Sequence, residues 1–597
     1  MNVLLRLMPY FQQHAWAFWT GISGLLVARI FEAMIPLYVK EGIDAIAAGQ
    51  AAIGAGTSSW EVAVQALSAP ALAIVACVLA QMVVTIISRI LIRRIGMTAA
   101  FDLRNRVYGH LQRQGPVFFN RYTIGDLMAR SINDISLIRQ FIAGTTRMTM
   151  VLIFTATVGL IFMFNLSVPL TLAILVPMPI VTLAAWHYSK KIYAQSYQVQ
   201  EGFSELSTFV QENLNGIRTV QAMAQEEREV ERFDVVNGRF LEYNMQLFNT
   251  TSLLGALMPV LAASGTLVIV AYGTTLVNSG EMTLGTLAAF FSYLALLLWP
   301  VREAGSLVTQ WQRGASGTAR VFEILDYEPE IRDLGQPDHP RLTGKVTVRN
   351  LSFQYENKDR NALDDISFSV DPGETIAIIG RVGSGKSTLL RLFVRLLDPS
   401  SGELLLDDHP IKDYPLAYLR EQVCQVLQDT FLFADSLGDN IAYDDPERHE
   451  NEILESADAA ALGETITEFP TGLATILGER GVTLSGGQKQ RATLARGLIR
   501  KTPLLILDDC FSAVDTETEE HILSGLKRVR RNLTTMLVSH RVSTARHADR
   551  IIVLDEGRIQ EMGTHAELLA LGGFYADLEA VQKLGGRGQD VSEVEVS

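Results

Sequence analysis

Residues 376–388 read IAIIGRVGSGKST, an apolar run that leads into a glycine-rich loop and then into a helical pattern. Glycines in such a loop let backbone N–H groups point inward around phosphate oxygens, and the N-terminus of the following helix adds partial positive charge. The lysine is expected to reach the β- and γ-phosphates of a nucleotide, and the serine after it a Mg²⁺ ion. We therefore predict a nucleotide-binding loop made of Gly380, Arg381, Val382, Gly383, Ser384, Gly385, Lys386, Ser387 and Thr388.

A second apolar run, Leu504–Leu507, ends in Asp508. In nucleotide-binding α/β domains a carboxylate at the end of a buried strand holds the metal ion. Strands that end in aspartate are common, so this run gains its weight from the loop upstream. Together they predict an α/β domain of the P-loop type over residues 344–582, with Asp508 on the Mg²⁺ side.

The first half of the chain is dominated by long apolar runs, and the mean hydropathy of the whole is +0.19. A bilayer core of about 30 Å needs roughly 20 apolar residues per helix. Six segments meet this requirement: Ala15–Val39, Ala69–Leu91, Met148–Leu166, Pro169–Trp186, Ser252–Val277 and Leu284–Ser306. We expect an all-α transmembrane domain over 1–320, a linker over 321–343 and a disordered tail over 583–597.

Basic residues are unevenly distributed between these segments. Glu41–Ser68, Asn165–Val168 and Asn278–Thr283 contain no Lys or Arg, whereas the other two connections are rich in basic residues, the first in Arg alone and the second in Lys and Arg. Because basic residues favour the cytoplasmic side, both termini are expected in the cytosol. The two basic connections read as long helical extensions, each broken once, near Gly125 and near Gly216. A short transverse helix at each break is the expectation, with a solvated turn as the alternative.

The composition also excludes some classes of function. A formal net charge of −14 argues against a nucleic-acid partner. Three scattered cysteines without ligand spacing predict neither a disulfide framework nor a zinc site.

Arg29 and Glu32 lie on one face of the first apolar segment, close enough to pair. They are candidates either for lining a cavity or for fixing helix packing.

The run Leu484-Ser485-Gly486-Gly487-Gln488 resembles the signature of ATP-binding cassette (ABC) transporters. In that family Ser485, Gly486, Gly487 and Gln488 would contact the γ-phosphate of ATP held by the opposite cassette, so the resemblance implies two cassettes with ATP and Mg²⁺. The resemblance implies roles for further residues: Tyr355 would stack on adenine, Gln428 would lie near Mg²⁺ with Ser387 and Asp508, and His540 would contact the γ-phosphate. Gln428 and His540 would take part in catalysis together with the residue at position 509. Glu479 precedes the signature, and Ser512–Asp515 resembles the loop that crosses the dimer interface.

The membrane half resembles the type I exporter branch of the family, with coupling helices at the two breaks. This implies ATP-driven export or flipping of a hydrophobic or amphipathic substrate, such as a drug, a lipid or a peptide, across a bacterial inner membrane. An importer is less in keeping with the pattern, because importers usually carry the membrane part and the cassette on separate chains.

The chain departs from the family pattern at Asp509, where a glutamate normally positions or deprotonates the attacking water. The shorter side chain retracts the carboxylate by roughly 1 Å, and a misplacement of that size can cost on the order of 100-fold in rate. The sequence thus resembles the degenerate half of a bacterial heterodimeric multidrug-type exporter, whose partner is a second half-transporter with the glutamate. Open alternatives are a backbone shift that restores the reach of Asp509, a homodimeric exporter, and an ATP-gated regulator or channel with little turnover.

Overall fold

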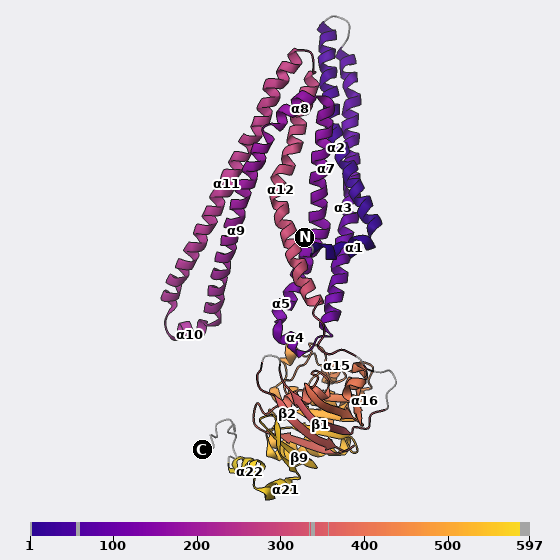
Figure 1. Ribbon diagram of the computed structural model, residues 1–597, viewed down its shortest axis with the longest axis vertical. Coiled ribbons are helices and arrows are strands. Elements are labelled where there is room, and N and C mark those ends of the chain that lie inside the picture. Colours follow the sequence, from indigo (N-terminus) through magenta and orange to yellow (C-terminus); the bar gives the residue numbers. More distant parts are fainter. Residues whose placement is uncertain (1–2, 55–59, 334, 336–340, 356–357, 585–597) are drawn as a thin grey trace. The chain divides into compact units, whose positions relative to one another are not determined.

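The computed structural model describes residues 3–54, 60–333, 335, 341–355 and 358–584 (Figure 1). The chain forms two compact units. Met1–Gln112 with Thr123–Tyr327 is called here the helical unit, and Arg113–Tyr122 with Glu328–Ser597 the cassette unit. The predicted tail lies outside the described residues from position 585, and the predicted linker lies outside them at 334 and 336–340.

The helical unit consists of long helices joined by short ones. Figure 1 shows α9 and α11 side by side, with α10 crossing between their ends. The helices are η1 (Leu4–Leu7), α1 (Met8–Gln13), α2 (Ala15–Gly54), α3 (Trp60–Leu111), α5 (Ile124–Ala129), α6 (Ile135–Gln140), α7 (Thr146–Leu166), α8 (Val168–Leu175), α9 (Met178–Asn215), α10 (Ile217–Ala222), α11 (Glu226–Asn278) and α12 (Leu284–Leu325).

The described residues contain five helices long and apolar enough to cross a membrane, and the shorter apolar helical stretch Val168–Ile180. The predicted count of six spans is therefore not confirmed. The fourth predicted span, Pro169–Trp186, falls on α8 and α9. Pro177 lies between these helices, and because proline has no N–H it cannot continue the hydrogen-bond ladder of α8. The last helix continues past position 320, where the membrane domain was expected to end.

Helices α2 and α3 approach each other closely through small residues. A Cβ on Gly24 would lie 2.2 Å from the hydroxyl of Ser88, a side chain that is almost fully buried. Small residues of this kind permit tight packing of membrane helices. The predicted pair is present in α2, where Arg29 forms an ion pair with Glu32.

The first break in the basic connections holds two short helices. The first of them, α4 (Pro116–Arg121), groups with the cassette unit, where the backbone N–H of Phe118 donates to Glu330 Oε1 at 2.9 Å. The second, α5, belongs to the helical unit. The second break holds α10, which begins directly after Gly216. A short helix is thus present at each predicted break.

An ionic network fixes α5 to the end of α12. Arg130, which begins a π-helical turn after α5, donates to Asp126 at 2.8 Å and to Glu323 at 2.9 Å. Arg320 of α12 completes the network through Asp126 and Asp134. The Arg130 side chain is only 10% exposed, so these carboxylates replace the water that its charge would otherwise need.

The cassette unit is built on a six-stranded sheet of order β10-β9-β3-β8-β7-β6, parallel except for β10. A second, antiparallel sheet has the order β2-β1-β4-β5. The strands are β1 (Val346–Phe353), β2 (Leu363–Val370), β3 (Thr375–Ile379), β4 (Ser401–Leu406), β5 (His409–Pro410), β6 (Val423–Val426), β7 (Leu504–Asp508), β8 (Thr534–Val538), β9 (Arg550–Asp555) and β10 (Arg558–Gly563).

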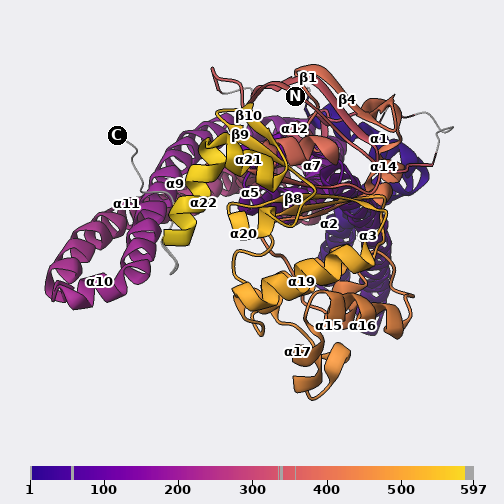
Figure 2. The ribbon, with the colours of Figure 1, turned by 90° about the horizontal axis from the view of Figure 1, so that it is seen from below.

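Alternate residues of the central strands enter two separate cores, as the period of a strand requires. In β3, Ile376 and Ile378 pack with the antiparallel sheet, whereas Ala377 and Ile379 pack with the helices of the other face. Figure 2 shows β1 and β4 on one side and α15, α16, α17 and α19 on the other. The helices are α13 (Lys386–Phe393), α14 (Leu416–Gln422), α15 (Leu437–Ile441), α16 (Glu450–Ala459), α17 (Gly463–Glu468), α18 (Gly486–Leu498), α19 (Thr516–Val529), α20 (Val542–Ala545), α21 (His565–Leu571) and α22 (Phe574–Leu584).

The segment that enters the cassette unit from the predicted linker is packed against it. Arg395, which is 2% exposed, donates to the main-chain carbonyl of Arg332 at 3.0 Å. The carboxylate of Asp333 accepts the backbone N–H of Leu416 at 3.1 Å. These described linker residues are therefore part of the cassette structure.

Candidate nucleotide-binding site

The glycine-rich loop connects β3 to α13 at the carboxyl end of the parallel sheet, where α/β folds place their ligands. The loop is held close to neighbouring backbone. A Cβ on Gly380 would lie 1.9 Å from the carbonyl oxygen of Leu554, and one on Gly385 would lie 2.4 Å from that of Ala362. Gly385 also has a φ of 101°, which side chains rarely allow. Glycine is required at both positions.

Lys386 folds back over the loop that precedes it. Its Nζ donates to the carbonyl oxygens of Gly380 and Arg381, both at 2.7 Å, and to Ser384 Oγ at 3.3 Å. Burial lowers the pKa of Lys386, and the nearby carboxylates of Asp509 and Asp508 oppose this effect. The ammonium therefore lies at the mouth of the loop, where it can pair with an anion.

The residues predicted to hold Mg²⁺ lie side by side. Ser387 Oγ donates to Asp508 Oδ1 at 3.5 Å. Burial raises the pKa of Asp508, the bond from Ser387 lowers it and the charge of Asp509 raises it further. A hydroxyl beside a buried carboxylate suits a hard cation. Ser387 and Asp508 thus fit a Mg²⁺ ion, which would neutralise charge on nucleotide phosphates.

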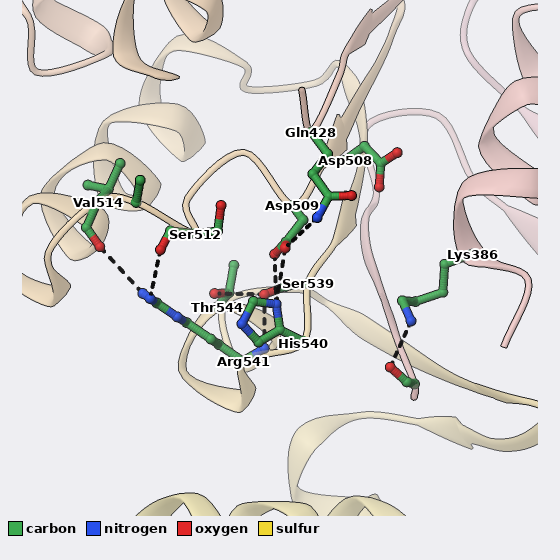
Figure 3. Close-up of polar contacts among 12 residues, drawn as sticks. Lys386, Gln428, Asp508, Asp509, Ser512, Val514, Ser539, His540, Arg541 and Thr544 are labelled. Carbon is green, nitrogen blue, oxygen red and sulfur yellow. Dashed lines mark hydrogen bonds and ion pairs between the residues drawn. The ribbon is translucent and has the colours of Figure 1, made fainter. Parts of the chain in front are cut away.

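The three residues predicted to be catalytic meet at one carboxylate (Figure 3). His540 Nδ1 lies 3.0 Å from Asp509 Oδ1, and Gln428 Nε2 donates to Asp509 Oδ2 at 3.4 Å. Asp509 has a φ of 44°, an unusual conformation for a residue with a side chain. The structure therefore brings together residues from three separate segments of the sequence around Asp509.

Tyr355, the predicted adenine platform, lies beside α13. Its hydroxyl is 3.1 Å from Thr388 Oγ1, and Arg391 donates to it at 3.5 Å. The ring makes an edge-on contact with Phe353 at the end of β1, with the centroids 4.9 Å apart. The aromatic ring is thereby placed next to the helix that the nucleotide loop opens.

The signature residues form the start of α18. Ser485 is the N-cap and accepts the N–H of Gln488 at 3.3 Å, while Gln488 Oε1 accepts the N–H of Ser485 at 2.9 Å. This is a capping box. Gly486 and Gly487 are the first residues of the helix. Among the described residues, no hydrogen bond or ion pair joins Ser485–Gln488 to residues 380–388 of the same chain.

Two contacts of the site were missed by the sequence analysis. Gln490 donates to Ser512 Oγ and accepts the N–H of Ala513, both at 2.8 Å, so it ties α18 to the predicted interface loop. Arg541 donates to Glu519 at 2.8 Å. It also donates to the carbonyl of Ser512 at 3.2 Å (Figure 3). Their partners are distant along the chain. The only signal in the sequence was therefore that Gln490 lies two positions after Gln488 and Arg541 directly after His540.

Comparison with known proteins agrees with this geometry. The model of the ABC transporter transmembrane region matches residues 18–301, and the ABC transporter model matches residues 363–512. The chain is 34% identical to the uncharacterized ABC transporter ATP-binding protein YknU of Bacillus subtilis, over 98% of both chains. This chain belongs to the ABC transporter family. The predicted family, and the order of a helical membrane domain before an α/β nucleotide-binding domain, are confirmed.

Other relatives of this ABC transporter place it among exporters. It is 36% identical to the probable multidrug resistance ABC transporter ATP-binding/permease protein YheI of Bacillus subtilis, over 81% of this chain and 83% of the relative. It is 33% identical to an ATP-dependent lipid A-core flippase of Aromatoleum aromaticum, over 98% and 96%. The structure of a bacterial Atm1-family ABC exporter with ATP bound matches with a TM-score of 0.75 and 27% identity, over 98% and 99% of the two chains.

The ABC exporter thus couples ATP hydrolysis to export or flipping, and it is a multi-pass membrane protein. Binding of ATP with Mg²⁺ follows from the nucleotide-binding domain in general. The hydrophobic or lipid-like substrates expected from the sequence are in keeping with the relatives.

Proposed function

We propose that this chain is one half of a heterodimeric ABC exporter in which the site built on its own nucleotide loop hydrolyses ATP slowly. Asp509 carries the proposal, because it stands where the family has a glutamate and its carboxylate is already engaged. His540 and Gln428 lie at hydrogen-bonding distance from it. A carboxylate that is short and held by two neighbours is a poor base for water.

The other site residues have roles that follow from their positions. Lys386 pairs with the β- and γ-phosphates, and residues 380–388 surround them. Ser387, Gln428 and Asp508 hold Mg²⁺, Tyr355 stacks on adenine, and His540 contacts the γ-phosphate. Ser485–Gln488 serves the nucleotide bound to the partner, since among the described residues no hydrogen bond or ion pair joins the signature to the loop of its own chain.

The substrate we propose is hydrophobic or amphipathic, such as a lipid, a drug or a peptide. The names of the relatives, a lipid A-core flippase and a multidrug resistance transporter, support this class.

The exporter we propose lies in the inner membrane of a bacterium, with both termini in the cytosol. The membrane domain, the linker and the cassette are proposed at 1–320, 321–343 and 344–582, and α4 and α10 act as the coupling helices.

The test is to purify the chain with its partner half in lipid nanodiscs and to exchange Asp509. In a complex whose partner has its catalytic glutamate replaced by glutamine, Asp509→Glu should raise the remaining kcat for ATP about tenfold or more with little change in KM, because it restores the reach of the base. With the unmodified partner, Asp509→Asn should leave the ATPase rate of the complex within about twofold, since the partner site carries the turnover.

Three results would contradict the proposal. Loss of all ATPase in Asp509→Asn would mean that Asp509 works as an ordinary base. Full activity of the chain purified alone, with a dimer of identical subunits in solution, would establish a homodimeric exporter instead. A complex that binds ATP and hydrolyses none would favour the ATP-gated regulator.

A further inference from the structure

We propose that Gln582, near the end of the C-terminal helix α22, is a positioning residue that fixes His540 for its contact with the γ-phosphate. The inference rests on the proposed role of His540 and adds a residue that none of the sequence motifs contains. It depends on two hydrogen bonds made by one side-chain amide.

The amide of Gln582 bridges both sides of the turn that carries His540. Its Nε2 donates to the main-chain carbonyl of His540 at 2.8 Å, and its Oε1 accepts the backbone N–H of Val542 at 2.9 Å. Val542 is the first residue of α20, and the first N–H of a helix has no partner within the helix. Gln582 therefore satisfies a donor that the turn cannot satisfy itself.

The start of α22 is anchored on the sheet. Glu561 of β10 accepts the backbone N–H groups of Phe574 and Tyr575, at 2.5 and 3.1 Å. The Tyr575 side chain is fully buried, and its hydroxyl lies 2.6 Å from His565 Nδ1 of α21. Because the helix is fixed at this end, Gln582 is presented to the His540 turn from a rigid support.

The same helix also contacts the nucleotide loop. The Arg381 guanidinium lies over the ring of Phe574, 5.3 Å from the centroid, a cation–π geometry. Thus α22 touches Arg381 near one end and His540 near the other. A helix that holds both segments keeps the histidine at a constant distance from the phosphates, which near-attack geometry requires.

The experiment measures amide hydrogen exchange at Val542 and ATPase kinetics in the full complex with the partner's catalytic glutamate replaced by glutamine, so that the kinetics report the site of this chain. Gln582→Met keeps the length of the side chain and removes both hydrogen bonds. It should raise the exchange rate of Val542 about fivefold or more, the factor expected for the net loss of one hydrogen bond. It should also lower kcat about tenfold with KM for MgATP within about twofold, since binding of ATP does not depend on His540 alone.

Two further variants separate positioning from stability. Gln582→Glu retains the acceptor for Val542 and loses the donor for the His540 carbonyl, so the exchange of Val542 should stay within about twofold while kcat falls. Lys583→Met is the matched control, because Lys583 is 70% exposed on the same helix and pairs only with Glu579 among the described residues. It should change neither quantity.

Unchanged exchange at Val542 in Gln582→Met would overturn the proposal, and so would faster exchange with unchanged kcat. A rise of KM with constant kcat would also overturn it, since this would mark a general role in binding ATP. If the unmodified complex had no ATPase, the proposed function would fail, and the inference about Gln582 would be decided by the exchange rates alone.

Discussion

The carboxylate of Asp508 is a charge placed where water hardly reaches, since the residue is 6% exposed. Burial raises its pKa, and the neighbouring Asp509 adds repulsion to this effect. In the absence of nucleotide and metal, the folded cassette therefore bears the cost of a poorly solvated anion.

Asp508→Asn should consequently stabilise the nucleotide-free exporter at pH 7 while weakening the binding of MgATP to the site of this chain. When folding raises the pKa of a group, the free energy of unfolding falls as the pH rises from the pKa in the unfolded state to the pKa in the folded state. The melting temperature should rise by roughly 2–4 °C at pH 7, as for a gain of about 1 kcal/mol. The gain should shrink as the pH falls through the raised pKa of Asp508, where the native carboxylate takes up its proton. A gain that stays constant as the pH falls would contradict this account.

Arg541 offers a second prediction at the residue scale. Its partner Glu519 is 3% exposed, so Arg541→Met leaves a buried carboxylate without its cation. The melting temperature should fall by roughly 5–10 °C, for a loss of about 3 kcal/mol. Arg546→Met is the control, because the pair of Arg546 with Glu520 is exposed on both sides and should be worth little. Equal losses in both variants would show that burial is not the cause.

Among the elements, the joint between α5 and α12 depends on one buried guanidinium. Arg130→Met removes the hydrogen bonds to Asp126 and Glu323, which are themselves partly exposed, and the helical unit should lose about 1–3 kcal/mol. Arg239→Met is its matched control, because the pair of Arg239 with Glu205 is half-exposed on both sides. Thermal unfolding in nanodiscs should show a clear drop for the first variant and no shift for the second.

The sequence predicted elements best where local chemistry determines them. The nucleotide loop and the strand of Asp508 follow from glycines, apolar runs and one lysine, all neighbours in the chain. Short helices near Gly125 and Gly216 were likewise anticipated. The division of the fourth span was not, because an apolar run reveals no break, although Pro177 and Pro179 were the available signals.

Contacts between distant segments could not be read from the sequence. Arg130 meets the carbonyl of Arg320 and the carboxylate of Glu323, which lie far along the chain. Gln490 and Gln582 bond to loops whose positions depend on the packing of the whole cassette. No local pattern distinguishes these glutamines from solvent-exposed ones, so a sequence alone gives them no role.

On the scale of the whole molecule, we expect each half to contribute signature residues to the nucleotide site of the other half. Ser485→Ala in this chain should abolish trapping of a photoreactive ATP analogue on the partner's nucleotide loop and leave trapping on this chain within about twofold. The two labelled chains are separated by gel electrophoresis. Loss of label from this chain instead would mean that its signature acts on its own nucleotide.

The hydrogen bond from Arg395 to the carbonyl of Arg332 limits where a fragment that contains the cassette can begin. The family match to the ABC transporter domain begins at residue 363. A fragment that begins there would lack β1, and the buried guanidinium of Arg395 would lose the carbonyl oxygen of Arg332 that accepts its hydrogen bond. A soluble fragment should begin no later than Glu328. Even then it would lack α4, which groups with the cassette unit and whose Phe118 donates its backbone N–H to Glu330. The smallest piece able to fold as it does in the intact exporter is therefore discontinuous in sequence.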